Sequence, residues 1–577
     1  MLSDQAPANT PANTTANTPA NTTASTPANT PANTPGNATA GSPAPGAPPP
    51  VWQALRHGVF RALWLASFGY FIANAMHTMA AAWLMVELTG SSFLAALVQT
   101  AVFLPMFLLA LPAGVLSDTT DRRRLLVVTL IVQAVSVLVL SGLLMAGWAG
   151  PATILVFTFI SGCCTAMLTP AWNSAVGEIL PRDELPQAIV AMSMAYNSAR
   201  ALGPTLAGLL YGLVKPSGGA LMGGGVVFGM AMLGMLAMAW AINRWPPRPH
   251  PISRLPPERI WGGTLAGLRY ARHSETILAQ LVRTAAFSAA GSALWALLPV
   301  IGQQRLGLGA AGFGLLMGCL GGGAVAAAFL LAPLRQRLGL ERLIATCCVV
   351  FALVMLVAGL SRWALPVYIG LVLGGASWMS VMSTFNMATQ TSAPPWVRSR
   401  ATAMHVLSAL GSFALGSALW GAVAGLLGLP AALSLAAALM LCGMFLAKPF
   451  PLRMGALHDV TQAPFEDLLV TDEPAHDEGP VAVEMAYRIR IEDADGFLAA
   501  ASRLKAPRQR DGATLWRIYR DLGDPTRYVE RFIVTSWADY LHQRARTTVA
   551  DQELEAAVRE FLAPGERVSM QHYVAER

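Results

Sequence analysis

Apolar runs of roughly 20 residues recur along most of this chain, and they constrain its fold more than any other feature. They extend from Leu63 to about Ala447 in a chain of 577 residues. A run of about 20 apolar residues is long enough to cross the hydrocarbon core of a bilayer as one helix. Because 54% of the residues are hydrophobic and only 12% are charged, the sequence predicts an all-α, multi-span membrane protein.

Twelve membrane-spanning helices are expected in this region. We place them at residues 63–86, 93–116, 125–145, 153–176, 188–214, 220–242, 277–301, 312–334, 343–360, 365–389, 401–427 and 431–447. Most connections are short, but the connection at 243–276 is long and basic. It divides the spans into six plus six, an arrangement found in transporters built from repeated halves.

Loop charges predict the orientation of these spans. Arginines gather in alternate connections, for example Arg122, Arg123 and Arg124 after the second span and Arg335 and Arg337 after the eighth. Short cytoplasmic loops of membrane proteins are enriched in Lys and Arg. We therefore expect a multi-pass protein of the inner membrane with both termini in the cytoplasm. The net charge of +7 is then a topology signal, and we expect no nucleic-acid partner.

The remaining regions differ sharply in composition. Residues 1–50 repeat Pro-Ala-Asn-Thr and are expected to be a disordered tail. The two six-helix halves are predicted at 51–242 and 277–448, joined by a cytoplasmic central loop at 243–276. An acidic linker follows at 449–480. Residues 481–577 have a β-α-β-β-α-β pattern, which predicts a cytoplasmic ferredoxin-like α+β domain.

Cysteine spacing gives no sign of a metal site. All six cysteines lie inside apolar runs and lack the spacing of a zinc or haem-attachment site, so we interpret them as small apolar residues. We predict no metal, no cofactor and no catalytic residue.

The loop after the second span carries a recognisable motif. Gly114, Asp118, Asp121, Arg122 and Arg123 match the pattern Gly-x-x-x-Asp-x-x-(Gly or Asp)-Arg-(Lys or Arg). With the six-plus-six order of spans, this motif resembles the major facilitator superfamily. The resemblance implies a twelve-helix secondary transporter in which Asp118 helps to close the inner gate by facing the positive end of a helix beginning near residue 401. The alternative is that the arginines only hold the loop in the cytoplasm.

The fifth span contains a second motif, at residues 197–208. It is similar to the Gly-Pro helix of exporters in this superfamily, which favours export over uptake; uptake remains an alternative. Arg200 lies near mid-depth in the span, where a charge is costly unless it is paired or lines a watery cavity, so a role in function or in a packing network is expected. The motif residues are Asn197, Arg200, Gly203, Pro204 and Gly208.

The resemblance also implies a central cavity for a small-molecule substrate, siderophore-like or drug-like. In this superfamily the first, fourth, seventh and tenth spans line it. His77 could instead be an ordinary helix contact. Proton coupling is left open, because the span at 153–176 has no charged residue where proton-coupled exporters commonly carry an arginine. The polar and aromatic candidates are Asn74, His77, Trp172, Asn173, Ser288, Ser292, Trp295, Trp378 and Asn386.

Shorter matches narrow the resemblance. Segments 88–91, 111–114, 121–124, 170–172 and 181–185 look like the transmembrane secretion effector branch, which includes enterobactin-exporter-like proteins. Residues 510–546 are similar to a tail domain of the antibiotic-biosynthesis-monooxygenase type, whose folds often pair as dimers. The tail is thus expected to regulate or dimerise the transporter. The alternative is a tail enzyme acting on a quinone-like or natural-product substrate, since a fold does not fix a function.

Overall fold

The computed structural model describes residues 51–179, 184–245, 260–394, 396–455, 460–463 and 474–576. The expected disordered tail at 1–50 lies outside these residues, as do parts of the central loop and of the acidic linker.

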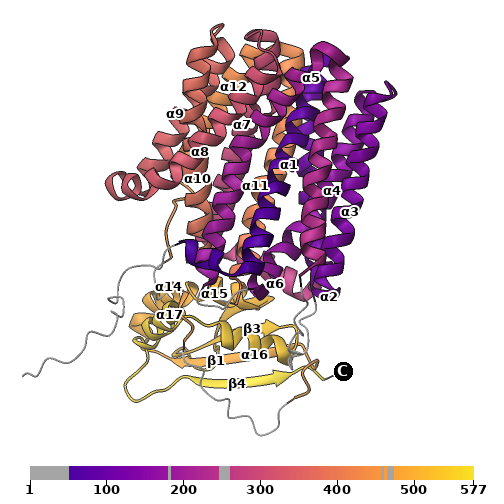
Figure 1. Ribbon diagram of the computed structural model, residues 1–577. Coiled ribbons are helices and arrows are strands. Elements are labelled where there is room, and N and C mark those ends of the chain that lie inside the picture. The colour runs from indigo at the N-terminus through magenta and orange to yellow at the C-terminus, as the bar shows by residue number, and fades with distance from the viewer. Residues whose placement is uncertain are drawn as a thin grey trace, which may run out of the picture. The chain divides into compact units, whose positions relative to one another are not determined.

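Long helices make up most of the structure (Figure 1). Within the described residues, eleven helices are long and apolar enough to cross a membrane. The helices are α1 (Gly58–Thr89), α2 (Ser92–Thr119), α3 (Arg122–Met145), α4 (Pro151–Ile179), α5 (Leu185–Asn243), α6 (Ile260–His273), α7 (Glu275–Val300), α8 (Ala310–Leu338), α9 (Leu340–Leu360), α10 (Ala364–Ser392), α11 (Arg398–Leu427) and α12 (Leu429–Gly443). Of these twelve, α6 is the one that is not counted among the eleven long apolar helices, and it lies in the expected central loop.

Two of the expected spans, 188–214 and 220–242, both lie within α5. This helix has 59 residues and is interrupted at Gly219, whose φ of 79° and ψ of 179° are not helical. About 20 residues suffice to cross a bilayer, so the length of α5 is enough for two crossings joined at Gly219.

Polar caps fix where several helices begin. The side chain of Ser91 accepts from the backbone N–H of Leu94 at the start of α2, and that of Asp121 accepts from Arg124 N–H at the start of α3. Such caps satisfy backbone donors that have no partner within the helix. Gly90, in the left-handed region with φ 63°, ends α1. The connection between α2 and α3 is therefore only Thr120 and Asp121.

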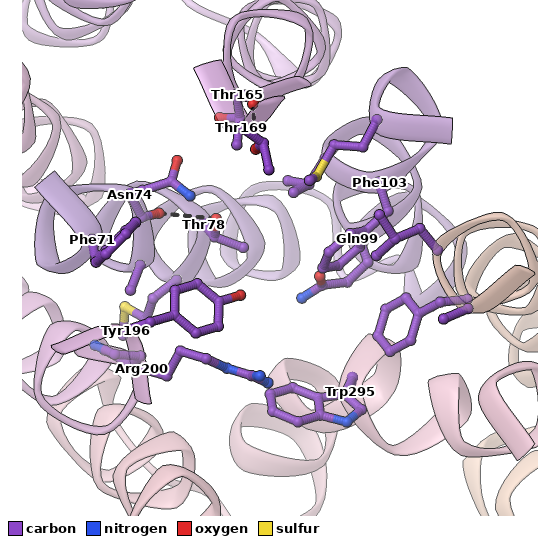
Figure 2. A pocket seen from close by; sticks show the side chains of 18 of the residues that line it. Phe71, Asn74, Thr78, Gln99, Phe103, Thr165, Thr169, Tyr196, Arg200 and Trp295 are labelled. Carbon is purple, nitrogen blue, oxygen red and sulfur yellow. Dashed lines mark hydrogen bonds between the residues drawn. The ribbon is translucent and has the colours of Figure 1, made fainter. Parts of the chain in front are cut away.

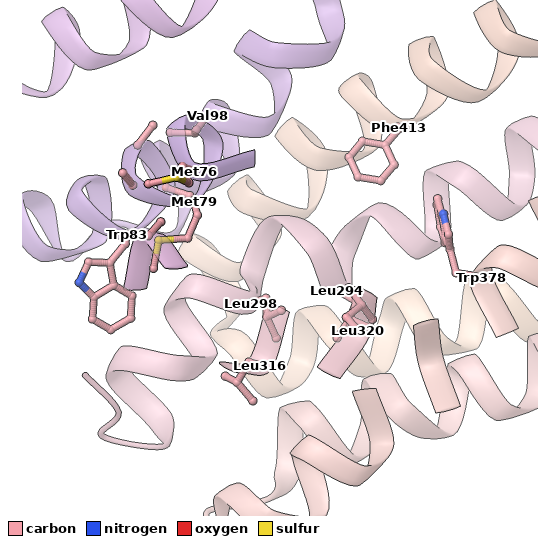
Figure 3. Packing of buried hydrophobic residues seen from close by; sticks show 14 of the residues in the cluster. Met76, Met79, Trp83, Val98, Leu294, Leu298, Leu316, Leu320, Trp378 and Phe413 are labelled. Carbon is pink, nitrogen blue, oxygen red and sulfur yellow. The ribbon is translucent and has the colours of Figure 1, made fainter. Parts of the chain in front are cut away.

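A single apolar cluster joins the helices of both halves. Figure 3 shows part of it, including Trp83 of α1, Trp378 of α10 and Phe413 of α11. Glycines bring the helices close together: a Cβ on Gly375 of α10 would meet the backbone of Leu320 in α8. Small residues allow such close packing in membrane helices.

One arginine of the bundle is buried and paired with a carboxylate. Arg283 of α7 is only 6% exposed and donates two hydrogen bonds to Glu341 of α9, at 2.6 and 2.8 Å. Glu341 also accepts from the backbone N–H of Leu452. The carboxylate partner, 58 residues away, makes the buried position tolerable.

The C-terminal part forms a four-stranded antiparallel sheet with the strand order β2-β3-β1-β4. Its elements are β1 (Val481–Arg488), α14 (Ala494–Ser502), α15 (Lys505–Asp511), β2 (Leu515–Arg520), β3 (Arg527–Val534), α16 (Trp537–Arg546), α17 (Val549–Arg559) and β4 (Ser569–Val574). Alternate residues of β1 and β3 are buried, and they form one apolar core with Phe497, Trp537 and Val558 of the helices. This period-two pattern places the helices on one face of the sheet.

Candidate functional site

A cavity of about 850 Å³ lies among the long helices. Its wall is built by α1, α2, α4 and α5 from the first half of the chain and by α7, α8, α10 and α11 from the second. Ligand pockets of drug-sized molecules occupy roughly 300–1,000 Å³, so the cavity is large enough for one small organic molecule.

Most of the cavity wall is apolar and adaptable. Methionines from both halves contribute, together with aromatic side chains such as Phe103, Phe313 and Phe413. Thioether side chains are flexible and polarisable, so they adjust to ligands of different shape. The methionines are Met79, Met106, Met192, Met238, Met317, Met379 and Met382.

Arg200 is the one charged side chain in the cavity wall, as far as the structure describes it. It reaches from α5 toward Trp295 of α7 (Figure 2), with its Cζ atom 4.8 Å from the Trp295 ring centre and 5.8 Å from that of Tyr196. Both distances are within the range of cation–π attraction. Arg200 therefore links the two halves through aromatic rings.

The Gly-Pro motif of α5 serves close packing around Arg200. A Cβ on Gly203 would come within 2.6 Å of the Ala75 Cβ in α1, and one on Gly208 would meet the carbonyl of Ala310 in α8. Pro204 itself lines the cavity. Asn197 lies outside the cavity wall and donates to the carbonyl of Ser193, one turn earlier. Of the five motif residues, Arg200 and Pro204 thus face the cavity.

Several contacts join the two halves between the cavity and the end of the bundle where Gly90 connects α1 to α2. We call this end the Gly90 side. Thr205 of α5 donates to the carbonyl of Gly314 in α8 at 3.2 Å, and Thr100 of α2 donates to that of Ala414 in α11 at 3.0 Å. The rings of Trp83 and Phe313 stack with centres 5.3 Å apart. These contacts join the two halves on that side.

The structure gathers six of the nine expected cavity residues in the wall: Asn74, Trp172, Asn173, Ser288, Trp295 and Trp378. The other three, His77, Ser292 and Asn386, are not part of the described wall. His77 is buried against Phe228 of α5, with ring centres 4.9 Å apart. Ser292 donates to Ala289 O, and Asn386 accepts from Gln390 one turn later.

The loop motif occupies the end of α2 and the start of α3. Gly114 and Asp118 lie in the last turns of α2, and the Asp118 side chain is outside the described part of the structure. Asp121 caps α3, Arg122 Nε donates to the carbonyl of Ser117 at 3.4 Å, and Arg123 donates to the carbonyl of Asn243 at the end of α5. The basic residues thus tie three helices together at this end.

The tail domain contains a buried polar cluster centred on Glu530. This carboxylate is 1% exposed and accepts from Tyr487 Oη at 2.9 Å, Arg508 Nε at 3.2 Å and Trp516 Nε1 at 2.9 Å. Burial raises the pKa of Tyr487, and the charge of Glu530 raises it further, so the phenol stays protonated as a donor. Since Arg508 also pairs with Glu555 at 2.9 Å, these groups satisfy one another.

No group of three His, Cys, Asp or Glu side chains in the described residues is placed to hold a metal ion.

The family model for transmembrane secretion effectors matches residues 50–577. The chain belongs to this family of major facilitator transporters. Several solved transporters share its fold. One is a bacterial homolog of the human lysosomal transporter Spinster, in an inward-facing and occupied conformation, with 16% identity and a TM-score of 0.55 over 69% of this chain and 98% of that one.

Curated relatives of this transporter include pumps. The multidrug efflux pump Tap of Mycobacterium tuberculosis is 26% identical over 404 residues, which cover 67% of this chain and 91% of the pump. The staphyloferrin A transporter of Staphylococcus aureus is 24% identical over 146 residues, which cover 25% of this chain and 37% of that protein.

Sequence reasoning missed the part of the transporter's cavity wall that comes from α2, α8 and α11. Gln99 and Phe103 of α2 and Phe413 of α11 all face the cavity. Gln99 is the lone amide side chain in an apolar span, and an isolated polar residue at such a depth is a signal for function. Phe103 and Phe413, with ring centres 4.8 Å apart, offered no such signal, because an aromatic residue in an apolar run looks the same whether it faces lipid or ligand.

Proposed function

We propose that this transporter exports small, largely apolar organic molecules, siderophore-like or drug-like, across the inner membrane by alternating access. The observation that carries the proposal is the cavity of about 850 Å³ with a wall shared by both halves. Rocking of two halves around a cavity at mid-depth exposes a bound molecule to one side and then the other.

The proposed topology has twelve spans in a six-plus-six arrangement, with α5 crossing twice around Gly219. The arginine-rich connections, including Arg122, Arg123 and Arg124, then face the cytoplasm, and so do both termini. In this orientation the Gly90 side is the outer side. Contacts between the halves on that side, such as that of Thr205 with Gly314, support the proposal of an inward-facing state.

Relatives and motifs favour export as the direction. The names of two relatives describe a multidrug efflux pump and a staphyloferrin A transporter, and the Gly203-Pro204 helix resembles that of exporters. The shorter sequence matches suggest the enterobactin-exporter-like branch. Import is the alternative.

The inner gate is proposed to form at the end of α2. Asp118 would face the N-terminus of α11, which begins at Arg398, because the positive end of a helix dipole stabilises a nearby carboxylate. A Cβ added to Gly114 would meet no atom within 4 Å in the present state. We therefore propose that a side chain at position 114 would interfere only when the inner gate is closed, because α2 and α11 then approach each other.

We further propose that the tail domain is ferredoxin-like, of the antibiotic-biosynthesis-monooxygenase type, and that it regulates or dimerises the transporter. Its strand order β2-β3-β1-β4 and its β-α-β-β-α-β sequence fit that fold. The Arg546 guanidinium lies 4.3 Å from the ring centre of Trp396, in the connection before α11, and Arg510 lies 5.6 Å from that of Tyr270 in α6. Contacts next to the proposed gate helix support a regulatory role.

Transport by inverted membrane vesicles tests the main proposal. Vesicles with and without the protein receive a panel of siderophores and apolar drugs, with a proton gradient, with an electrical potential alone, and with neither. Export predicts accumulation inside inverted vesicles, whereas an importer accumulates the compound in right-side-out vesicles. If no compound moves under any condition in either orientation, the transport proposal fails for this substrate class.

The tail enzyme alternative has its own test. Oxygen consumption by the full-length protein with a panel of quinols separates catalysis from regulation. We expect none above the background of quinol autoxidation, because the buried polar groups around Glu530 are occupied with one another.

A further inference from the structure

We propose that the cavity selects organic anions: amphipathic molecules with one acidic group, such as a carboxylate, on an apolar or aromatic body. In this assignment Arg200 binds the acidic group between the two halves. The proposal deepens the proposed function and rests on it for the claim that the bound molecule is also transported.

The charge of the cavity is the first argument. Arg200 is the charged residue of the wall, and the described wall contains no Asp or Glu. Elsewhere in the same bundle a buried arginine, Arg283, has a carboxylate partner at 2.6 Å. A guanidinium at mid-depth in a membrane protein is costly unless an anion or water compensates it. A ligand carboxylate would supply the compensation that the described wall does not.

The geometry of Arg200 leaves its donors available. Its contacts in the described structure are the rings of Trp295 and Tyr196. A cation–π contact uses the positive charge but engages no oxygen acceptor. The guanidinium has five N–H donors in a planar fork that matches a carboxylate with two parallel hydrogen bonds. Arg200 can therefore hold an acidic group while it remains against the rings.

Buried donors in the same wall are a second, independent observation. The Trp172 side chain is 7% exposed and Ser288 is 1% exposed, and both line the cavity. Trp172 Nε1 and Ser288 Oγ are buried with no hydrogen-bond partner among the described residues. Buried polar groups are nearly always hydrogen-bonded in proteins. Both donors belong to residues of the cavity wall, so a turn of either side chain would offer its donor to acceptor atoms on the ligand, such as carbonyl or carboxylate oxygens.

The rest of the wall defines the ligand body. Met106, Met317 and Met382, together with Phe103 and Phe313, surround the same space and favour an apolar or aromatic moiety. An organic cation finds the apolar wall but meets the like charge of Arg200. The cavity thus selects ligands by charge at Arg200, whereas its apolar wall accepts ligand bodies of different shape.

Equilibrium binding to the purified full-length transporter in nanodiscs tests the charge preference. Three probes share one pyrene body: 1-pyrenebutyrate, its neutral amide and 1-pyrenebutylamine. Energy transfer from the tryptophans to pyrene reports binding at pH 7.5, with empty nanodiscs as the background. Because a hydrogen bond between two charged groups is stronger than one to a neutral group, the wild type should bind the carboxylate about tenfold or more tightly than the amide or the amine.

Variants locate the preference. Arg200→Gln should bring the three affinities to within about twofold of one another, and Arg200→Lys should retain part of the preference, since it keeps the charge but loses the fork. Arg244→Gln is the matched control, because Arg244 also stacks on a tryptophan, with its Cζ 4.1 Å from the Trp240 ring centre, but does not line the cavity. Size-exclusion profiles verify folding. A wild type that prefers the amine or the amide, or an Arg200→Gln variant that keeps the preference, would overturn the proposal.

These outcomes are separate from those of the transport assay. Charge-selective binding without vesicle transport supports the anion site and removes the export function. Transport without charge-selective binding supports the export function and removes the anion site.

Discussion

The transport bundle and the tail domain both hold arginines that are partly shielded from solvent, but they satisfy the charge in different ways. In the tail, Arg508 pairs with Glu530 and Glu555, and Arg510 pairs with Asp511 at 2.7 Å and Asp551 at 2.6 Å. In the cavity, Arg200 contacts only rings among the described residues. A closed network of charges leaves no donor for a ligand and stabilises one structure, whereas an arginine held by rings keeps its donors free. The difference separates a structural arginine from one that we assign to binding.

The sharpest test of this comparison is removal of a carboxylate from the tail network. Glu530→Gln removes one of the two carboxylates that pair with Arg508, so we expect a cost somewhat below the roughly 3–5 kcal/mol of breaking a fully buried pair. We expect faster amide hydrogen exchange throughout β1 and β3 of the full-length protein, while exchange in the bundle helices is unchanged. The exposed pair of Glu484 with Arg531 at 3.4 Å provides the control, Glu484→Gln, with little effect. Unchanged exchange in the Glu530 variant would show that the network contributes little to stability.

A second test compares two arginines within the bundle. Arg283→Gln removes both hydrogen bonds to Glu341, and because Glu341 is 41% exposed, we expect a loss of about 1–2 kcal/mol rather than the full cost of a buried pair. Arg200→Gln should change stability by less than about 0.5 kcal/mol, since no carboxylate is left behind. Thermal unfolding of both variants in detergent measures this difference. Equal losses would mean that Arg200 is also part of a structural network.

The same contrast applies to the two acidic residues of the loop motif. Asp118→Ala should leave the protein inserted and folded but reduce transport about tenfold, equivalent to about 1.4 kcal/mol in the switching step. Asp121→Ala removes a helix cap, which costs about 1 kcal/mol of stability, and should reduce transport less. Vesicle transport, normalised to the amount of inserted protein, distinguishes the two. Wild-type transport by Asp118→Ala would mean that the motif only holds the loop in the cytoplasm and has no role in gating.

The smallest expected effect is a pH dependence confined to the tail. Burial lowers the pKa of His572, with a further contribution from the charge of Arg544, and Tyr540 Oη lies 2.6 Å from His572 Nε2. Because the folded pKa is below the unfolded value of about 6.5, the folded state binds fewer protons in this window, and stability falls as pH decreases below about 6.5. Tail hydrogen exchange should accelerate from pH 7.5 to 5.5, after correction for intrinsic exchange rates. His572→Gln should remove that change, and its persistence would assign the effect to another group.

Much of the fold could be predicted because the bilayer simplifies the problem. A helix that crosses it must be about 20 residues long and apolar, so the runs from Leu63 to Ala447 gave the helices directly. The strands of the tail were predicted from alternation, as in Val481, Val483 and Met485, which are all buried. For the break at Gly219, the sequence predicted only that one span ends and the next begins near this residue. The non-helical φ and ψ of Gly219 could not be predicted from the apolar runs.

The site was less predictable, because facing direction is not encoded in composition. Asn74 and His77 are three residues apart on α1, yet Asn74 lines the cavity and His77 packs against Phe228. The two residues are less than one helical turn apart. The pattern of apolar residues around them does not show which one faces the cavity, because lipid and packed protein both favour apolar side chains.

The sequence alone determined that this protein crosses a membrane, where its helices lie, which loops carry positive charge and which family motif it bears. These follow from local properties, namely run length, loop charge and spacing. Only the tertiary structure decided that Arg283 is neutralised by Glu341, 58 residues away, whereas Arg200 lies against Trp295 of the other half in a cavity with no described carboxylate. Whether a charged side chain has a partner of opposite charge depends on which distant side chains fold against it, and the packing of the helices sets those neighbours.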